Sequence, residues 1–505
     1  MAKEQDRLVV LVHGWSVHNT NTYGKLADRL EAEARRDLGL RIDVRHIWLS
    51  EYVSFRDEVR LEDVSRAFDA AVHRELGPLL DKGRRFVCIT HSTGGPVVRD
   101  WWNRYYVQRP RSGACPMSHL IMLAPANFGS ALAQLGKSRI GRLKSWFEGV
   151  EPGERILDWL ELGSPESWTL NTGWFDYPEK PGGRNPVFPF VLTGQSIDHS
   201  LYDHLNSYTG ELGSDGVVRV AAANLNATYV HMTQENPKPV TEGDAPKYEA
   251  KALRIREVRR SPRTAFALIE GRAHSGRTMG IMRSIRAGEQ HDPAVDAILA
   301  CLHVENAADY AALCDDFEKL TAEVQRRELL EKEIRLLLPD HHFIHDPHAM
   351  VIFRIQDDAG YPVGDFDLEL TAGPQDSPNH LPKGFFGDRQ KNRRHQGTLT
   401  YFFNHAVMTG AEAVTGDDGK VYRPALPGAK SLGFGITPYL NEDLVHYLPA
   451  KLKATARQLE QFLKPHETTL VDITLRRVVR ERVFRLTTDR GAKDFRRGPA
   501  GPMVP

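Results

Sequence analysis

The chain has 505 residues, and 66 basic against 66 acidic side chains leave no net formal charge. At roughly 150 residues per domain this length suggests about three units, and a composition of 41% hydrophobic and 26% charged residues is typical of folded proteins rather than disordered or fibrous ones. A neutral chain lacks the overall positive charge of nucleic-acid-binding proteins, so no nucleic-acid partner is expected.

The sequence gives no sign of a metal centre, a disulfide framework or a membrane segment. Its four cysteines form no CxxC pair, and we expect no metal and no cofactor. The N-terminus lacks the apolar core and cleavage site of a signal peptide, and no apolar run approaches the ~18 residues of a membrane span. We therefore expect a protein that is cytoplasmic or is exported without a cleaved signal peptide.

Segments 1–290 alternate apolar runs with amphipathic stretches. Strands are predicted at 8–12, 42–49, 86–90, 120–124, 187–193 and 265–269, and helices at 23–36, 61–80 and 93–107. Uninterrupted apolar runs are typical of strands buried on both faces of a parallel sheet. The alternation predicts an α/β fold with a doubly wound, mostly parallel sheet. A Trp- and Leu-rich segment at about 128–185 interrupts it and predicts a helical lid inserted above the sheet.

The rest of the chain has a different texture. The polar stretch 234–263 predicts a long exposed loop, and 292–304 and 307–338 predict helices that form a connector over 291–338. Short alternating runs separated by turn residues then predict a β-rich, sandwich-like accessory domain over 339–490. The basic, Gly- and Pro-rich tail 491–505 is expected to be disordered.

The strongest chemical signal is the sequence THSTGG at 90–95, between a predicted strand and a predicted helix. A serine on such a tight turn projects its hydroxyl above the sheet edge, where a base can reach it. Gly94 supplies the small residue that the turn needs after Ser92, whereas Thr90 departs from the G-x-S-x-G form. A helix-capping serine is the alternative interpretation of the same pattern.

A second motif, LVHGWS at 11–16, lies at the end of the first predicted strand and favours the catalytic interpretation. A glycine there lets the backbone turn so that the next N–H points toward a developing oxyanion. We expect the backbone N–H groups of Trp15 and Thr93 to form the oxyanion hole.

The base and the acid are predicted from their positions relative to strands. His274, in the loop GRAHSG after the strand at 265–269, lies where ligand sites of open α/β sheets form. A base needs a buried carboxylate to fix its tautomer. Asp215, in GSDGVV, is the preferred acid, and Asp198, which closely follows the strand at 187–193, is the alternative. The order Ser92, Asp215, His274 is the order of nucleophile, acid and base in α/β-hydrolases.

These motifs together resemble the α/β-hydrolase superfamily, specifically its lipase and esterase branch, including bacterial lipases and esterases related to the GPI-inositol deacylase. The resemblance covers about residues 7 to 290. It implies a Ser-His-Asp triad without a metal, and hydrolysis of a carboxylic ester through an acyl-enzyme. The last third of the chain has no counterpart in this resemblance.

The lid is the main indication of the substrate. Its aromatic and aliphatic residues, among them Trp146, Trp159 and Leu160, are interleaved with basic residues, which suits the binding of an acyl chain and peripheral contact with a membrane. The alternative is that these residues only pack the lid onto the core. We expect a lipid ester, a phospholipid or a glyceride, as the substrate of a lipase or phospholipase.

Other functions remain open on the sequence. An acyltransferase or a thioesterase would use the same fold, and a non-catalytic binding protein would use it as a scaffold. Loosely, the chain also resembles antibacterial lipase effectors, which lack cleaved leaders. His345, Asp346 and His348 have the composition of metal ligands, but no further ligand cluster is near them in sequence and a turn is preferred. The partner of the accessory domain is unknown.

Overall fold

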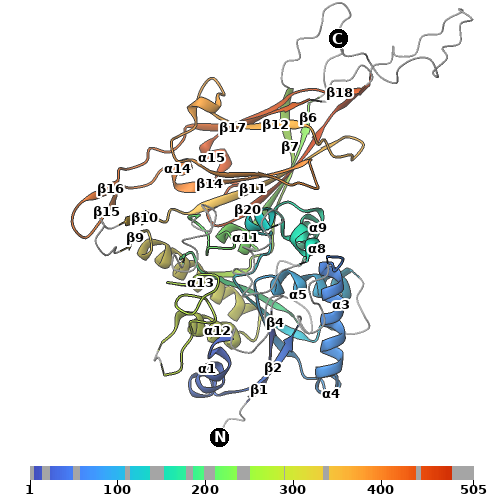
Figure 1. The fold of residues 1–505 in the computed structure, drawn as a ribbon, viewed down its shortest axis with the longest axis vertical. Helices are drawn as coiled ribbons and strands as arrows, with labels where there is room; N and C mark the ends of the chain where they lie inside the picture. Colours follow the sequence, from blue (N-terminus) through green and yellow to red (C-terminus); the bar gives the residue numbers. More distant parts are fainter. Residues whose placement is uncertain are drawn as a thin grey trace, which may run out of the picture.

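The computed structural model describes residues 5–13, 23–48, 57–108, 114–136, 153–177, 186–197, 211–235, 251–288, 291–333, 341–439 and 445–479. Two large sheets lie one above the other along the long axis of the molecule, with a layer of short helices between them (Figure 1). None of the helices in these ranges combines the length and the apolar character that a membrane crossing requires.

The first sheet is six-stranded, in the order β2-β1-β3-β4-β5-β8, and every strand pair in it is parallel. It confirms the strands predicted in the first part of the chain. Neighbouring side chains on β1 pack into different cores, because Val10 joins one hydrophobic cluster and Val9 the other. The strands are β1 (Gln5–His13), β2 (Leu40–Trp48), β3 (Phe86–His91), β4 (Met117–Leu123), β5 (Phe188–Thr193) and β8 (Ala265–Leu268).

Helices cover both faces of the first sheet, as expected for a doubly wound fold. One core contains residues of α3 and α5, and the other contains residues of α1, α12 and α13. The helices are α1 (Leu26–Glu33), α3 (Leu61–Ala71), α4 (Gly77–Leu80), α5 (Gly94–Trp102), α12 (Pro293–His303) and α13 (Ala307–Arg327), and π-helical turns extend α1, α3 and α5 over Ala34–Leu38, Val72–Leu76 and Asn103–Gln108.

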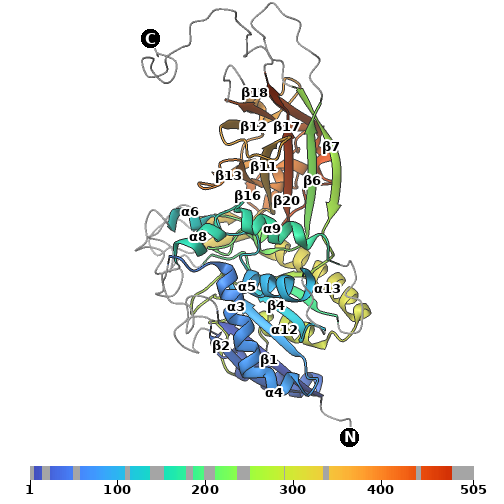
Figure 2. The same cartoon turned by 90° about the vertical axis from the view of Figure 1, so that its right-hand side faces the viewer.

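The inserted segment lies between the two sheets. It contains α6 (Leu132–Gly136), α8 (Glu154–Leu160) and α9 (Pro165–Trp174) (Figure 2), and α11 (Val220–Ala223) lies in the same layer (Figure 1). The hydrophobic cluster on this side of the first sheet continues through Trp159 and Trp168 to Met350 and Phe402 of the second sheet. The described part of the insertion therefore packs between the first and the second sheet.

The second sheet is nine-stranded and mixed, in the order β12-β17-β19-β7-β6-β20-β11-β14-β13. Two of its strands, β6 (Ala227–Gln234) and β7 (Lys251–Arg260), come from the segment that also builds the first sheet. The others are β11 (His348–Asp357), β12 (Phe366–Ala372), β13 (Phe386–Lys391), β14 (Thr398–Asn404), β17 (Ser431–Pro438), β19 (Ala450–Thr455) and β20 (Thr468–Leu475). This sheet agrees with the predicted accessory β domain.

Small elements complete the described chain. Three two-stranded sheets pair β9 (Leu330–Glu333) with β10 (His341–Ile344), β15 (Val414–Thr415) with β16 (Val421–Arg423), and β18 (Val445–Tyr447) with β21 (Arg477–Val479). The remaining helices are α14 (His405–Thr409), α15 (Ala456–Leu459) and the 3₁₀ turn Pro378–His380.

Two predictions of local structure are wrong. The loop expected at 234–263 contains β7, whose exposed Ile255 and Val258 alternate with arginines. Strands that bury little on either face lack an apolar run, so their sequence looks like a loop. The helix expected at 307–338 ends at Arg327, and 330–333 form β9 instead, because pairing with β10 overrides helix propensity there. The tail 491–505 lies outside the described residues.

Candidate active site

Ser92 lies on a sharp turn between β3 and α5. Its φ of 52° is in the left-handed region, which a residue other than glycine adopts only under constraint. The constraint comes from backbone hydrogen bonds, since the Ser92 N–H donates to the Leu123 carbonyl over 3.0 Å and the Ser92 carbonyl accepts from the Gly95 N–H over 3.2 Å. This geometry is that of the nucleophile elbow predicted from the sequence.

The turn accommodates the unusual Thr90 because Gly94 has no side chain. A Cβ at Gly94 would lie 3.3 Å from the Thr90 Cβ, and a Cβ at Gly95 would lie 2.8 Å from the Cβ of Pro125. Thr90 itself is fully buried. Thr90 therefore makes glycine more strictly required at position 94, and Pro125 does so at position 95.

His274 lies beside Ser92 in the loop after β8. Its Nε2 is 3.1 Å from Ser92 Oγ, and its Nδ1 is 2.9 Å from Asp215 Oδ2. A carboxylate only accepts hydrogen bonds, so Nδ1 carries the proton and Nε2 presents its lone pair to the serine hydroxyl. All three side chains are buried.

Asp215 is held by several hydrogen bonds in addition to the one from His274. Oδ1 accepts from the N–H groups of Val217 and Val218 over 3.0 and 2.7 Å. The backbone carbonyl of Asp215 also accepts from the His274 N–H over 2.9 Å. Asp198, the alternative acid, lies outside the described residues.

His91 is a residue of this site that the sequence did not single out. Its Nε2–H donates to the His274 carbonyl over 3.0 Å, and the two rings are 4.8 Å apart. Burial, with a further contribution from His274, lowers the pKa of His91 to about 3, so the ring is neutral at ordinary pH. The sequence feature that could have identified His91 was its position directly before Ser92.

The predicted oxyanion donors are described only in part. Thr93 precedes α5, at a helix end whose first N–H groups have no intrahelical acceptor and favour an anion. Trp15 lies outside the described residues.

A cavity of about 10 Å³ adjoins Ser92 and Thr93, and Leu157 and Leu160 of α8 form part of its wall. Trp159 instead lines a separate cleft of about 530 Å³ together with Arg60, Arg104 and other polar residues. Residues 157 and 160 are three apart and share a helix face, whereas residue 159 does not. The structure thus brings Leu160 close to the serine and directs Trp159 elsewhere, and Trp146 lies outside the described residues.

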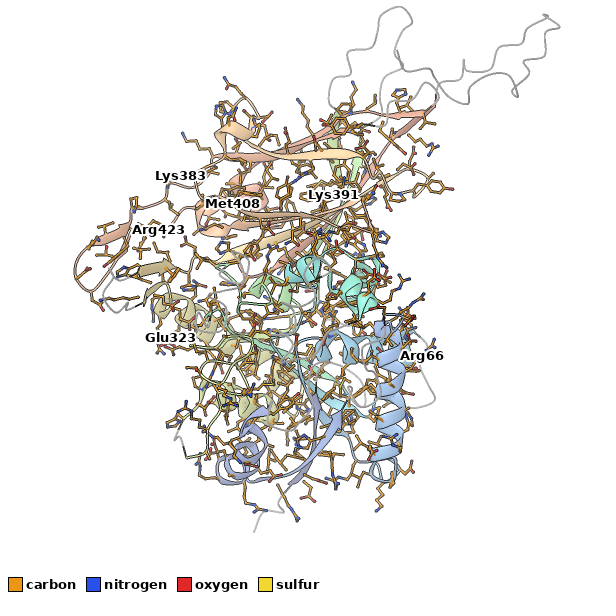
Figure 3. All side chains as sticks on the ribbon, in the orientation of Figure 1. Arg66, Glu323, Lys383, Lys391, Met408 and Arg423 are labelled. Carbon is orange, nitrogen blue, oxygen red and sulfur yellow. The ribbon has the colours of Figure 1, made fainter. Side chains whose placement is uncertain are left out.

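The candidate ligands His345, Asp346 and His348 do not converge on one point. Asp346 forms an ion pair with Arg423, which is labelled in Figure 3. His345 Nε2 lies 2.6 Å from Glu331 Oε2. His348 Nδ1 donates to the Asp346 carbonyl over 2.8 Å. Within the described ranges no three His, Cys, Asp or Glu side chains are grouped in a way that suits a metal ion.

No protein-family model and no curated protein matches the chain. Among solved structures it is similar to phospholipase PlaB from Legionella pneumophila, with 42% identity, a TM-score of 0.83, and 97% of this chain and 98% of that chain covered. PlaB in complex with thio-NAD gives 40% identity, a TM-score of 0.80 and 97% coverage of each chain. The mature form of the Bacillus licheniformis lipase BlEst2 is 16% identical over 43% of this chain and 79% of its own, with a TM-score of 0.30.

Proposed function

This chain belongs to the family of phospholipase PlaB and is a lipid-ester hydrolase, and we propose that it cleaves phospholipid esters with Ser92 as nucleophile, His274 as base and Asp215 as acid. The observation that carries this assignment is the continuous hydrogen-bonded path from Ser92 Oγ through His274 to Asp215, over 3.1 and 2.9 Å. These residues come from three distant parts of the chain and have the nucleophile–base and base–acid hydrogen bonds that a catalytic triad requires.

In the proposed reaction, Ser92 Oγ attacks the ester carbonyl while His274 Nε2 takes the hydroxyl proton. The carbonyl oxygen becomes an oxyanion, which accepts hydrogen bonds from the Thr93 and Trp15 N–H groups. His274 then gives the proton to the leaving alcohol, and an acyl-enzyme remains. A water molecule, deprotonated by His274, attacks this ester and releases the carboxylic acid and Ser92. Asp215 stabilises the imidazolium in both steps.

The test combines covalent labelling with substrate turnover. A fluorophosphonate probe is expected to modify Ser92 in the wild-type protein and to leave Ser92→Ala unlabelled, while circular dichroism and the melting temperature of the two proteins agree. Wild-type protein is expected to release fatty acid from phosphatidylcholine vesicles, and Ser92→Ala is not. Near-normal turnover by Ser92→Ala would reject the assignment.

The class of ester is tested with a panel from short p-nitrophenyl esters to long-chain phospholipids, below and above the micelle threshold. We expect a higher rate with aggregated phospholipid. Equal rates would favour a water-soluble ester. Adding an alcohol acceptor separates hydrolysis from acyl transfer, because a transferase would form a new ester.

Membrane contact through the insertion stays a prediction. Trp159 and Leu160 are buried in the described structure, which favours their packing role there. The compartment, cytoplasmic or reached by export without a cleaved leader, also stays a prediction, and so do the domain boundaries expected at 290, 338 and 490.

A further inference from the structure

The segment 211–219, here named the acid loop, carries Asp215 and is closed on itself. The Ser214 hydroxyl donates to the Glu211 carbonyl over 2.7 Å, and Ser214 and Arg219 form a β-bridge. Gly213 and Gly216 have φ values of 78° and 93°, which glycine adopts without strain. Because the loop is short and bonded to itself, contacts that fix its ends also constrain the position of the Asp215 carboxylate.

Arg219 fixes the end of the acid loop by contacts on both sides of its guanidinium. Within the loop, Nε and Nη2 donate to the two carboxylate oxygens of Glu211, each over 2.8 Å. From the second sheet, Asp388 on β13 forms an ion pair with Nη2, and the Phe402 ring on β14 lies 4.3 Å from the guanidinium carbon. The Arg219 side chain is 1% exposed, and a buried planar cation with two carboxylates and a ring is strongly oriented.

The start of the acid loop also touches the second sheet. A Cβ at Gly213 would lie 2.8 Å from His348 Nδ1 on β11, so the loop backbone packs directly on this imidazole. His348 in turn stacks on Phe402, with 4.8 Å between ring centroids. Burial lowers the pKa of His348 to about 4, so a neutral ring faces the loop.

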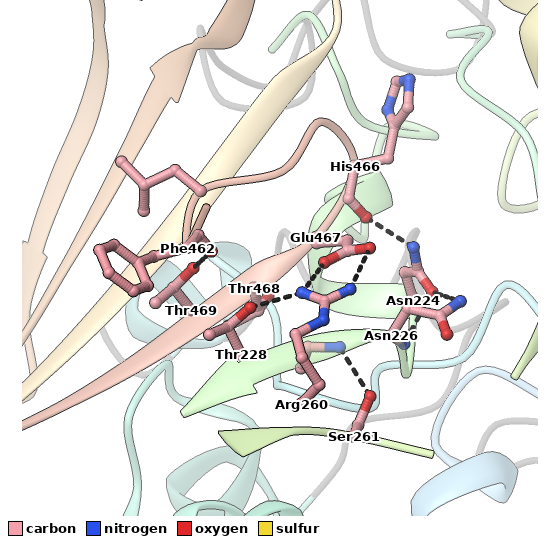
Figure 4. Close-up of polar contacts among 12 residues, drawn as sticks. Asn224, Asn226, Thr228, Arg260, Ser261, Phe462, His466, Glu467, Thr468 and Thr469 are labelled. Carbon is pink, nitrogen blue, oxygen red and sulfur yellow. Dashed lines mark hydrogen bonds and ion pairs between the residues drawn. The ribbon is translucent and has the colours of Figure 1, made fainter. Parts of the chain in front are cut away.

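The residues that follow the acid loop are held from the same side. Thr468 of β20 donates its hydroxyl proton to the Ala221 carbonyl over 2.7 Å. The Asn224 side chain donates to the His466 carbonyl over 2.9 Å, beside the ion pair of Arg260 with Glu467 (Figure 4). The chain then enters β6, which pairs with β20.

We propose that the second sheet positions the catalytic acid, and that Arg219, held by Asp388 and Phe402, is a positioning residue that acts on catalysis through Asp215. The inference rests on the proposed role of Asp215. Small displacements of a catalytic group lower the reaction rate strongly because proton transfer needs aligned donors and acceptors. The second sheet then contributes directly to catalysis and is not only an accessory domain.

Asp388→Ala tests the proposal, because it leaves Arg219 in place but removes its tie to the second sheet. The matched control is Asp472→Ala on β20, since Asp472 is a buried carboxylate that pairs with Arg354, and Arg354 lies 4.6 Å from the Trp168 ring centroid. This control pair joins the second sheet to the insertion and does not contact the acid loop. Both variants are expected to lower the melting temperature by similar amounts.

The readout that separates positioning from stability is the steady-state hydrolysis of p-nitrophenyl butyrate, a soluble ester. We expect Asp388→Ala to lower kcat by about 10- to 100-fold with KM within about twofold, and to slow fluorophosphonate labelling in parallel. Asp388→Asn is expected to recover much of kcat, because its amide oxygen still accepts from Arg219. Asp472→Ala is expected to keep kcat within about twofold of the wild type.

Two outcomes overturn the inference: Asp388→Ala with wild-type kcat, or Asp472→Ala with an equal loss of kcat. The wild-type protein in the same assay reports separately on the proposed function. If wild type is unlabelled and inactive, the triad assignment fails. If wild type is active and Asp388→Ala matches it, only the positioning role fails.

Discussion

Replacing Asp215 by asparagine is expected to enforce the wrong tautomer of His274. The N–H groups of Val217 and Val218 both donate to Oδ1, over 3.0 and 2.7 Å, so the amide oxygen of the substituted side chain would take that position. Turning the amide over would break both bonds in a buried site, at about 1–3 kcal/mol each. The amide NH₂ then faces His274 Nδ1 and donates to it. Nδ1 must accept, so Nε2 carries the proton and cannot deprotonate Ser92.

The expected loss in kcat is about 10⁴-fold, the size found when a triad acid is made an amide in a well-studied serine protease, or about 5.5 kcal/mol in the barrier. Asp215→Ala is expected to retain more activity than Asp215→Asn, although it leaves two buried N–H groups unpaired and lowers the unfolding free energy by about 1–3 kcal/mol for each. The reason is that an alanine forces neither tautomer.

Hydrolysis of p-nitrophenyl butyrate and the rate of fluorophosphonate labelling measure this order, with urea unfolding as the control for stability. Folded Asp215→Asn with kcat within tenfold of wild type would contradict the assignment of the acid and would favour Asp198. An alanine variant less active than the asparagine variant would contradict the tautomer argument.

Three further predictions concern the elbow, pH and the substrate cavity. Gly94→Ala is expected to cost about 1–3 kcal/mol in urea unfolding and to slow labelling of the serine, because its Cβ would lie 3.3 Å from a buried Cβ. Burial lowers the pKa of His348 to about 4 and of His466 to about 3, so below about pH 6.5 the unfolded chain binds protons that the folded chain does not. The free energy of unfolding should therefore decrease as the pH is lowered, by about 2 kcal/mol per histidine at pH 5. His466→Asn, in which asparagine tolerates the φ of 59° at this position, should show a smaller decrease between pH 7 and pH 5, as measured by urea unfolding. Leu160→Ala is expected to shift kcat/KM toward long-chain esters by about tenfold, whereas Trp159→Phe should not, and equal shifts would reject the cavity as an acyl site.

The parallel sheet and the serine could be predicted because both are recorded locally. Strands such as 86–91 are buried along their whole length, which requires an uninterrupted apolar run. The elbow needs a small residue close after the serine, and this requirement falls on Gly94 within the same short segment. His274 follows its strand closely, so counting from predicted strands was enough to find it.

Part of the second sheet could not be predicted because some of its strands bury little on either face, whereas β11, β14 and β20 are buried along most of their length. β7 and β19 carry lysines and arginines on exposed positions, and such alternation resembles a polar loop when the partner strand is unknown. Asp388 lies on β13, whose burial is as slight. Its role beside Arg219, 169 residues away in sequence, depends on a pairing that no local pattern records.

The position of Asp215 depends both on the first sheet, which could be predicted, and on the second sheet, which was harder to predict. Asp215 lies just before the chain leaves the first sheet through α11 and enters β6 of the second, so its surroundings are set by both sheets. Sequence order relative to a strand favoured two carboxylates, and what distinguishes Asp215 in the structure is a compact loop tied by Arg219 to a distant strand. His274 could be found from the strand that it follows, whereas the loop of Asp215 is tied to the second sheet by a contact that the sequence does not show. If the positioning role of Arg219 holds, loss of the second sheet should impair the chemistry even on a soluble ester, which an independent accessory module would not do.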